Sequence, residues 1–302
     1  MTDPGVSGVP KIAGAVIVAY FPDPDVIARI TRLSRFVQQL VVVDNTPGGA
    51  AIELPIESAG NVRLLVMMEN MGIAFALNIG IKYLLDAGCG YVFLFDQDSD
   101  VTSSALQALL DCCYQAQQVG QVAQVGPAYF DRRLGRLAPF IRREGLRIRR
   151  LPAQGEQIIR ADYLITSGAC ITREAWNAVG PMDDSLFIDF VDIEWGLRAN
   201  ALGWASYGCP QIVMQHTLGE EPISVFGRRY PLHSPLRHYY FVRNGIALMR
   251  RSYVPLCWKL IELTKLPIRF VVYGVFADNG AAHFKMMLSG LWHGMIGRSG
   301  RR

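Results

Sequence analysis

The sequence has 302 residues, of which 51% are hydrophobic and 19% are charged. A chain of this size and composition buries a large core, which excludes an intrinsically disordered protein. The six cysteines form no CxxC pair and no disulfide framework, and the first residues lack the apolar stretch of a signal peptide. We therefore expect a globular protein of the reducing cytoplasm with free thiols.

The net charge of +4 is divided unevenly along the chain. Residues 228–302 contain 13 Lys and Arg but only Glu262 and Asp278 as acidic residues, so this tail carries +11 and the remainder −7. Such an asymmetry predicts a tail that faces an anionic surface, either phospholipid or nucleic acid. Because the remainder is too acidic for a nucleic-acid groove, we expect no nucleic-acid partner.

Short apolar runs rich in Val and Ile alternate with helical periodicity in the first hundred residues. The expected strands are residues 14–20, 40–43, 62–68 and 91–95. The expected helices between them are residues 25–40 and 70–90. This alternation predicts an α/β fold with an open, mostly parallel sheet, in which ligands bind outside the carboxyl ends of the strands.

Three later segments complete the prediction in chain order. A helix is expected over residues 103–118, opened by Ser103 or Ser104. Residues 131–156 carry eight arginines with little periodicity, which indicates a loop or hairpin insert. The apolar stretch from Tyr253 is interrupted by charged residues and a proline, so it can lie on a membrane but should not cross one.

The segment DQDSD follows the fourth expected strand and places Asp96, Asp98 and Asp100 at alternate positions. Carboxylates spaced in this way can converge on a hard cation such as Mg²⁺, Mn²⁺ or Ca²⁺. An EF-hand calcium loop is excluded, because Val101 and Gln107 occupy the positions that require Gly and Glu. The structural alternative is that these residues cap the next helix, which we favour for Asp100.

Two enzymatic interpretations of DQDSD remain. A haloacid-dehalogenase-like phosphatase would use Asp96 as a covalent nucleophile, although Asp100 stands where that class has Thr or Val. A nucleotide-sugar glycosyltransferase would use a DxD motif, in which a divalent cation bridges the diphosphate of the donor. The three-residue pattern is weak by itself and needs partners elsewhere in the chain.

A second acidic cluster lies in SLFIDFVDIEWGLRANALGW, which contains Asp189, Asp192 and Glu194 beside Trp195. A glycosyl transfer that inverts configuration needs a carboxylate that takes the proton of the acceptor hydroxyl. Asp192 sits centrally in this cluster, which makes it the candidate base.

The ordered motifs VVVDN, ENMGIAFALNIGI, FLFDQDSD, TSGACITREAW and FIDFVDIEWGLRA resemble family-2 glycosyltransferases of the bacterial rhamnosyltransferase type. The resemblance covers roughly residues 13–217. It implies a GT-A fold, a mostly parallel nucleotide-binding sheet flanked by helices, and an inverting displacement that uses Mg²⁺ or Mn²⁺. It also implies a nucleotide-sugar donor, most typically dTDP-L-rhamnose, and a lipid-linked glycan acceptor in surface polysaccharide (O-antigen or similar) biosynthesis.

The resemblance also assigns roles to individual residues. The nucleotide side would consist of Ala19, Tyr20, Asp44, Asn45, Asn70, Gly72, Asn78, Asp96 and Gln97. The metal would be held by Asp98 and His216, Asp192 would be the base, and the acceptor side would consist of Ser167, Gly168, Glu194 and Trp195. A plain turn remains the alternative for Asp44 with Asn45 and for Ser167 with Gly168, and a lone histidine after a strand is more often structural.

We expect two parts, a GT-A catalytic domain over residues 1–227 and a helical, basic and amphipathic extension over residues 228–302. Arginines of the extension, with Tyr239 and Tyr240, would hold the diphosphate of the acceptor, face anionic headgroups or remain solvated; they are Arg237, Arg243, Arg250 and Arg251. A homodimer contact stays open. The expected location is the cytoplasmic, inner face of the bacterial membrane.

Two further alternatives explain less of the sequence. A sugar nucleotidyltransferase would need a Gly-rich basic loop after the first strand, where this chain has AYFPDPD. A non-enzymatic binder of anionic lipid or nucleic acid would explain the basic tail but not Asp192.

Overall fold

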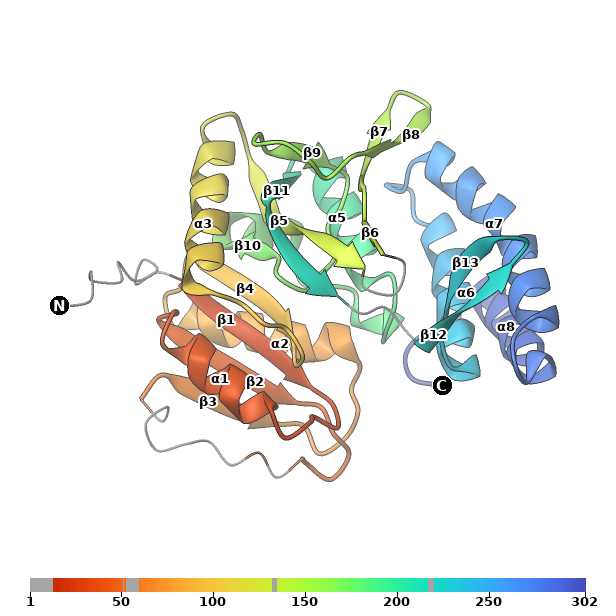
Figure 1. Ribbon diagram of the computed structural model, residues 1–302, viewed down its shortest axis with the longest axis horizontal. Coiled ribbons are helices and arrows are strands. Elements are labelled where there is room, and N and C mark those ends of the chain that lie inside the picture. Colours follow the sequence, from red (N-terminus) through yellow and green to blue (C-terminus); the bar gives the residue numbers. More distant parts are fainter. Residues whose placement is uncertain (1–12, 51, 53–59, 132–134, 217–219) are drawn as a thin grey trace.

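The computed structural model describes residues 13–50, 52, 60–131, 135–216 and 220–302. One mixed sheet forms its centre, with strand order β3-β2-β1-β4-β10-β5-β11-β9 and the short β6 beside β5 (Figure 1). Its strands are β1 Ala13–Ala19, β2 Gln39–Asp44, β3 Val62–Val66, β4 Tyr91–Asp96, β5 Val122–Asp131, β6 Arg136–Leu137, β9 Ile159–Ala161, β10 Cys170–Thr172 and β11 Ala205–His216. Four neighbouring pairs in it are parallel, namely β3-β2, β2-β1, β1-β4 and β5-β11.

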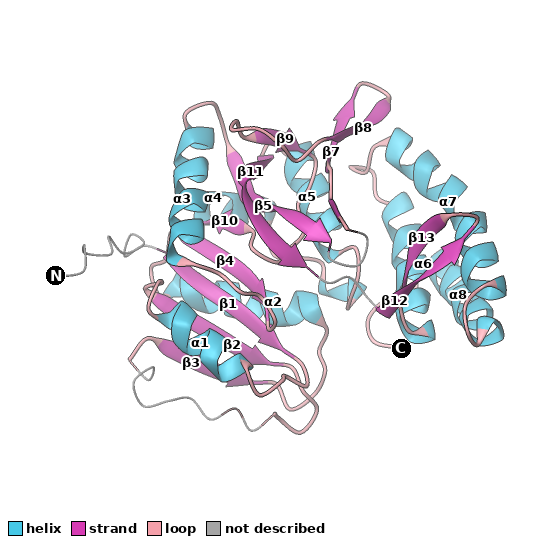
Figure 2. Cartoon of the chain, viewed as in Figure 1, coloured by secondary structure: helices cyan, strands magenta, loops and turns pink. Residues whose placement is uncertain are grey.

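Helices cover both faces of this sheet (Figure 2). They are α1 Val26–Ser34, α2 Ile73–Asp86, α3 Ser103–Gln117, α4 Arg173–Val179 and α5 Val191–Ala201. Alternate residues of β1 face opposite layers, because Ala15 and Ile17 pack with α1 and α3, whereas Val16 and Val18 pack with α2 and α5. This two-sided burial explains why the sequence of β1 is continuously apolar.

The remaining elements lie at the end of the molecule opposite β3 (Figure 1). They are the hairpins β7 Phe140–Glu144 with β8 Arg147–Leu151 and β12 Glu220–Val225 with β13 Arg228–Leu232, and the helices α6 Pro235–Met249, α7 Leu256–Val275 and α8 Gly280–Ile296. The arginine-rich insert is thus a hairpin, as expected. The expected domain boundary at 227 and 228 falls inside the turn of the β12-β13 hairpin, so the two strands of one hairpin would be divided.

The helix expected over residues 25–40 is shorter than its apolar periodicity indicates. It ends at Ser34, because Asn61 donates its side-chain N–H groups to the carbonyls of Ser34 and Val37. The backbone of Gln38 then bonds to Ala13, which directs the chain into β2. A side chain distant in sequence therefore ends this helix.

Helix α3 begins as expected at Ser103, but its N-cap is Thr102, whose hydroxyl accepts a hydrogen bond from the backbone N–H of Ala105. The acidic residues of DQDSD are therefore not needed to cap this helix. All six cysteines lie within the described residues, where each is free and buried. No helix of the described chain combines the length and apolarity that crossing a bilayer would need.

Candidate active site

A cavity of about 860 Å³ lies where β4 ends and α5 begins. Carboxylates line one side of it, at Asp96, Asp98, Asp189 and Asp192. Elements of the C-terminal part close the other side, because residues of β13, α6 and α7 also line the cavity. The structure therefore brings the two acidic clusters of the sequence to one site.

The DQDSD turn is held by its glutamine. The side-chain oxygen of Gln97 accepts a hydrogen bond from the backbone N–H of Tyr20 at 2.6 Å, and its carbonyl accepts one from Nε of Arg29 at 2.7 Å. Asp98 is consequently presented to the cavity as an exposed carboxylate. Asp100 does not line the cavity and pairs with Arg32 at 3.1 Å on the surface, so its role is structural, but the expected helix cap is wrong because Thr102 is the N-cap of α3.

Asp192 lies in the first turn of α5 and lines the cavity. One of its carboxylate oxygens accepts a hydrogen bond from the backbone N–H of Ile193 at 2.8 Å. The pKa of Asp192 is raised to about 6, mainly by burial and also by the nearby carboxylates of Asp189 and Asp96, while the backbone hydrogen bond opposes this shift. A carboxylate of this pKa is ionised at neutral pH and is a stronger base than an ordinary aspartate.

The loop that leads into Asp192 has an unusual backbone. Phe187, Asp189 and Phe190 all have positive φ angles, which L-residues adopt only when surrounding contacts hold them. The side chain of Asp189 is only 9% exposed and accepts hydrogen bonds from Nε and Nη2 of Arg237, both at 3.1 Å. Burial raises the pKa of Asp189, and the charge of Arg237 opposes that shift.

Two adjacent residues of α6, Arg243 and Asn244, form hydrogen bonds to the backbone of the same loop. The side-chain amide of Asn244 donates to the carbonyls of Leu186, Ile188 and Asp189 at 2.9, 2.7 and 3.0 Å. The guanidinium of Arg243 also donates to the carbonyl of Leu186, at 2.8 Å. Both side chains are buried, so these hydrogen bonds are shielded from water.

Arg243 was expected to hold the acceptor diphosphate, face headgroups or remain solvated, but it is buried against this loop, and Asn244 had no expected role. A buried arginine or asparagine must have hydrogen-bond partners, but the sequence does not show which polar residues of α6 are buried.

Four of the residues expected around the nucleotide lie near the carboxyl ends of β1, β2 and β3, namely Ala19, Asp44, Asn45 and Asn70. Their hydrogen bonds are made largely to one another and to the neighbouring backbone. Asp44 accepts hydrogen bonds from the backbone N–H groups of Thr46 and Ala50, as in the turn alternative. The amide of Asn45 bonds to Asn70 at 3.2 Å and accepts from the backbone of Met71 at 2.9 Å. Ala19 belongs to this frame through its carbonyl, which accepts from the backbone N–H of Asn45.

Gly72 and Asn78 contact the other half of the site. Gly72 has φ +87° and lies so close to Phe187 that a Cβ atom would be 2.6 Å from the Phe187 carbonyl oxygen. The side chain of Asn78 bonds both the N–H and the carbonyl of Met182 at 2.9 Å. Both residues thus join α2 to the loop before Asp192, and neither lines the cavity.

Ser167 forms part of the cavity wall, and its hydroxyl lies 2.8 Å from that of Ser99. Gly168 lies behind it with φ +74°, where a Cβ would be 2.6 Å from the sulfur of Met214. His216 ends β11 and its backbone pairs in register with Asp131. The side chain of His216 lies outside the described part of the structure, so its expected role stays a prediction.

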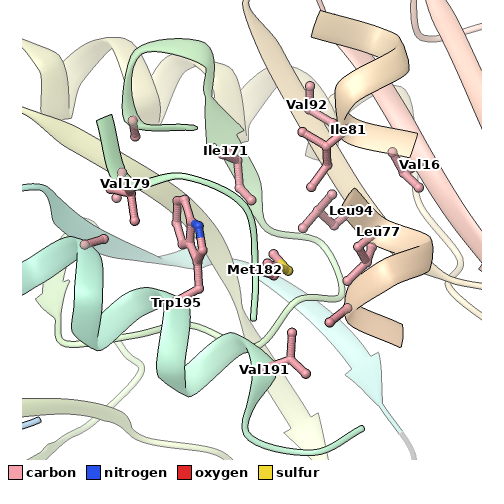
Figure 3. Packing of buried hydrophobic residues seen from close by; sticks show 14 of the residues in the cluster. Val16, Leu77, Ile81, Val92, Leu94, Ile171, Val179, Met182, Val191 and Trp195 are labelled. Atoms are coloured by element: carbon pink, nitrogen blue, oxygen red, sulfur yellow. The ribbon is translucent and has the colours of Figure 1, made fainter. Parts of the chain in front are cut away.

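Glu194 and Trp195 do not lie where the sequence analysis expected them. Trp195 points into the core among Met182 and Ile171 (Figure 3), and its Nε1 donates to the carbonyl of Gly180 at 2.9 Å. Glu194 is buried, pairs with Arg198 at 2.7 Å and accepts from the hydroxyl of Tyr253 at 2.5 Å. Both residues face away from the cavity because α5 presents Asp192 on one side and this pair on another.

The cavity wall formed by the C-terminal part was not expected from sequence, apart from Arg237. It includes His233, His238, Arg269 and Tyr273. Burial lowers the pKa of His238 to about 3, and its Nδ1 lies 2.9 Å from Nδ1 of His283, so His238 is neutral at physiological pH. His233 lies between β13 and α6, His238 lies on α6, and Arg269 and Tyr273 lie on α7, so their approach to β4 depends on long-range packing.

Comparison with known proteins identifies the family of the chain. No family model matches the chain. The dTDP-rhamnosyl transferase RfbF of Shigella flexneri is 33% identical over 289 residues, which cover 95% of this chain and 96% of RfbF. The chain belongs to the rhamnosyltransferase type of family-2 glycosyltransferases.

Two solved structures share the fold of this rhamnosyltransferase-type chain. GalNAc-T7 with UDP, GalNAc and Mn²⁺ matches 94% of it with a TM-score of 0.54 at 12% identity, and the chain spans 56% of that protein. TarS 1-349 of S. aureus matches 93% of it with a TM-score of 0.54 at 11% identity, over 80% of that protein. At these identities the likeness concerns the fold alone, and it confirms the expected GT-A fold.

The protein is therefore a glycosyltransferase. Neither the fold nor the relative supports the phosphatase alternative, in which Asp96 would be a nucleophile.

Proposed function

We propose that the protein transfers L-rhamnose from dTDP-L-rhamnose to a hydroxyl group of a lipid-linked glycan, with inversion at the anomeric carbon. The donor is taken from the relative, which is a dTDP-rhamnosyl transferase. The observation that carries the proposal is Asp192, a cavity carboxylate of raised pKa that lies close enough to Asp96 to be affected by its charge. Asp192 can thus act as the base, while Asp96 and Asp98 are available to bind the metal and the donor.

The reaction needs one proton acceptor and one leaving group. Asp192 takes the proton of the acceptor hydroxyl as its oxygen bonds to the anomeric carbon, and the bond from that carbon to the dTDP oxygen breaks with its electron pair. The fixed loop before α5 supports this role, because Arg243 and Asn244 bond to its backbone and Arg237 bonds to the side chain of Asp189. dTDP then leaves with the charge of its diphosphate increased.

Asp98, with Asp96 beside it, would hold Mg²⁺ or Mn²⁺. The described residues contain no cluster of three or more His, Cys, Asp or Glu that could hold a metal by itself. Two carboxylates nevertheless fit this use, because Mg²⁺ in nucleotide enzymes is commonly held by one or two carboxylates together with substrate phosphates. The bound cation would neutralise the charge of the departing diphosphate.

The proposed acceptor side is the cavity wall formed by Ser167 and by residues of α6 and α7. The aromatic rings of Phe241 and Tyr273 line this wall together with Arg237 and Arg269. Such a mixture of flat apolar and cationic groups suits a sugar that is joined to a diphosphate. The place of the reaction would be the inner face of the membrane, where surface polysaccharide such as O-antigen is assembled on a lipid carrier.

A transfer assay tests this function. Purified protein is incubated with Mg²⁺, radiolabelled dTDP-L-rhamnose and the lipid-linked glycans extracted from bacterial membranes, and label in the organic phase is counted. Labelled lipid that appears with the unmodified protein but not with Asp192→Asn supports the proposal. Equal labelling by the Asp192→Asn protein, or transfer from UDP-sugars in preference to dTDP-L-rhamnose, would contradict it.

A further inference from the structure

Helices α7 and α8 expose long apolar side chains in two continuous stripes. On α7 the exposed residues are Leu256, Leu260, Leu263, Ile268, Val271 and Val275. On α8 they are Phe284, Leu288, Trp292, Met295 and Ile296. Most of these residues are three or four positions apart, which places each set on one broad side of its helix.

The two stripes adjoin one another. The ring of Phe270 on α7 lies 5.3 Å from that of Phe284 on α8, and Gly274 allows the helices to approach at this point. The β12-β13 turn extends the surface, because Phe226 is 94% exposed and its ring lies 5.8 Å from Phe276 at the end of α7. We call these two stripes, together with Phe226 and Phe276, the apolar face.

The packing inside the molecule does not account for this apolar face. Helix α8 packs on α6 through His283, Met287, Gly290 and Gly294, where the glycines bring the two backbones together. Helix α7 turns Arg269 and Tyr273 toward the cavity, while its apolar stripe lies on the opposite side. A contiguous apolar surface of this extent marks an interaction site rather than ordinary protein surface.

The charges around the apolar face decide its partner. Four cations are exposed on or beside the elements that carry it, namely Arg228, Arg229, Lys285 and Arg298, against the exposed Asp278, whereas Glu262 is buried in ion pairs with Lys265 and Arg269. A second copy of the chain would bring two such mainly cationic surfaces together. An anionic bilayer instead complements both the apolar stripes and the flanking cations.

We propose that the apolar face docks onto the surface of an anionic phospholipid bilayer, with the stripes of α7 and α8 lying in the interface. If the proposed function holds, α7 then connects the bilayer to the active site, because its other side forms the cavity wall through Arg269 and Tyr273. A glycan carried by a membrane lipid would enter the cavity along this helix. The docking itself does not depend on the identity of the substrates.

Vesicle flotation with the full chain tests the proposal without donor or acceptor. One variant combines Leu260→Ser, Leu263→Ser and Trp292→Ser, which are exposed positions whose substitution leaves the core intact. The control combines Val119→Ser and Leu202→Ser, which are 72% and 54% exposed and follow α3 and α5, outside the C-terminal helices. Vesicles of phosphatidylcholine alone and of phosphatidylcholine with phosphatidylglycerol are compared.

The unmodified and control proteins should float with the anionic vesicles, bind them more strongly than neutral ones, and lose binding in high salt. The triple variant should bind roughly tenfold less tightly or worse, because three apolar side chains no longer enter the interface. Equal flotation of the triple variant, or equal binding to neutral vesicles, would overturn the proposal. A dimer in sedimentation that the triple variant abolishes, without any vesicle binding, would assign the face to a second copy. Because the assay contains no sugar nucleotide, its failure would leave the transfer function standing.

Discussion

The carboxylate of Asp192 combines two properties that a base in glycosyl transfer needs, access to the cavity and a raised pKa. Its pKa of about 6 predicts that kcat/KM for transfer rises tenfold per pH unit below pH 6 and levels off above it. Asp192→Asn should remove transfer while dTDP affinity changes little. Initial rates from pH 5 to 8, paired with calorimetry of the variant, measure both effects, and a flat profile across pH 6 would assign the proton transfer to another group.

The same carboxylate affects stability with a defined sign. Because the folded protein holds the pKa of Asp192 above its ordinary value of 3.8, the ionised form is disfavoured in the fold, and its contribution to stability falls as pH rises through about 6. Asp192→Asn should therefore raise the unfolding free energy at pH 8 by about 2 kcal/mol, and the Tm should rise with it. At pH 4 the gain should shrink. A larger gain at pH 4 than at pH 8 would be inconsistent with the raised pKa.

Asp98 and Asp100 form a natural pair for testing the metal site. Asp98 is exposed to the cavity, whereas Asp100 pairs with Arg32 outside it. Asp98→Ala should weaken dTDP binding in the presence of Mn²⁺ by roughly tenfold or more, because a carboxylate near the diphosphate is lost. Asp100→Ala should leave that affinity unchanged. Calorimetry that finds the same loss in both variants, or in neither, would remove Asp98 as a ligand.

At the scale of elements, β1, β2 and β4 could be predicted from the sequence because their apolar runs are buried on both faces. The limits of α1 could not, since Asn61 ends that helix from outside it. Glu194 and Trp195 were misplaced for a related reason. Only some residues of a helix that begins at a cavity face that cavity, and the sequence does not reveal which side of α5 faces the core.

The hydrogen bonds from Asn244 of α6 to the loop before Asp192, which we call the α6 clamp, should affect both stability and turnover. Asn244→Ala removes the side-chain donor of the Ile188 and Asp189 carbonyls and one of two donors to Leu186, and should lower the unfolding free energy by about 1–3 kcal/mol. The control is Asn61→Ala, which also removes a donor shared by two backbone carbonyls but lies far from the cavity. Both variants should lose stability in thermal unfolding, while only Asn244→Ala should lower kcat. Equal kcat values in the two variants would show that the clamp is merely structural.

For the whole molecule, the C-terminal helices share the core of the catalytic half. Trp258 of α7 is buried in the cluster that contains Phe190 and Val191, and the rings of Trp258 and Phe190 lie 6.0 Å apart. The boundary expected near residue 227 was inferred from the change in charge, which reports on the surface and not on the core. Packing that joins distant segments, like the cavity wall from β13, α6 and α7, leaves no local pattern in the sequence.

This shared core predicts that residues 13–302 unfold together. Scanning calorimetry should show one transition, and Trp258→Ala should lower its midpoint, with a cost of about 3–5 kcal/mol. The fluorescence of the protein and the binding of dTDP should be lost over the same temperature range. Two separate transitions, with dTDP binding retained after the first, would instead establish an independent C-terminal domain.

A metal-dependent site for a dTDP-sugar on a GT-A fold is tested most directly by calorimetric titration of the full chain. The ligands are dTDP, UDP and GDP, each with and without Mn²⁺. We expect dTDP to bind more tightly than the other two nucleotides and its binding to require the cation. Binding of none of the three, or equal binding of all three without Mn²⁺, would rule out such a donor site.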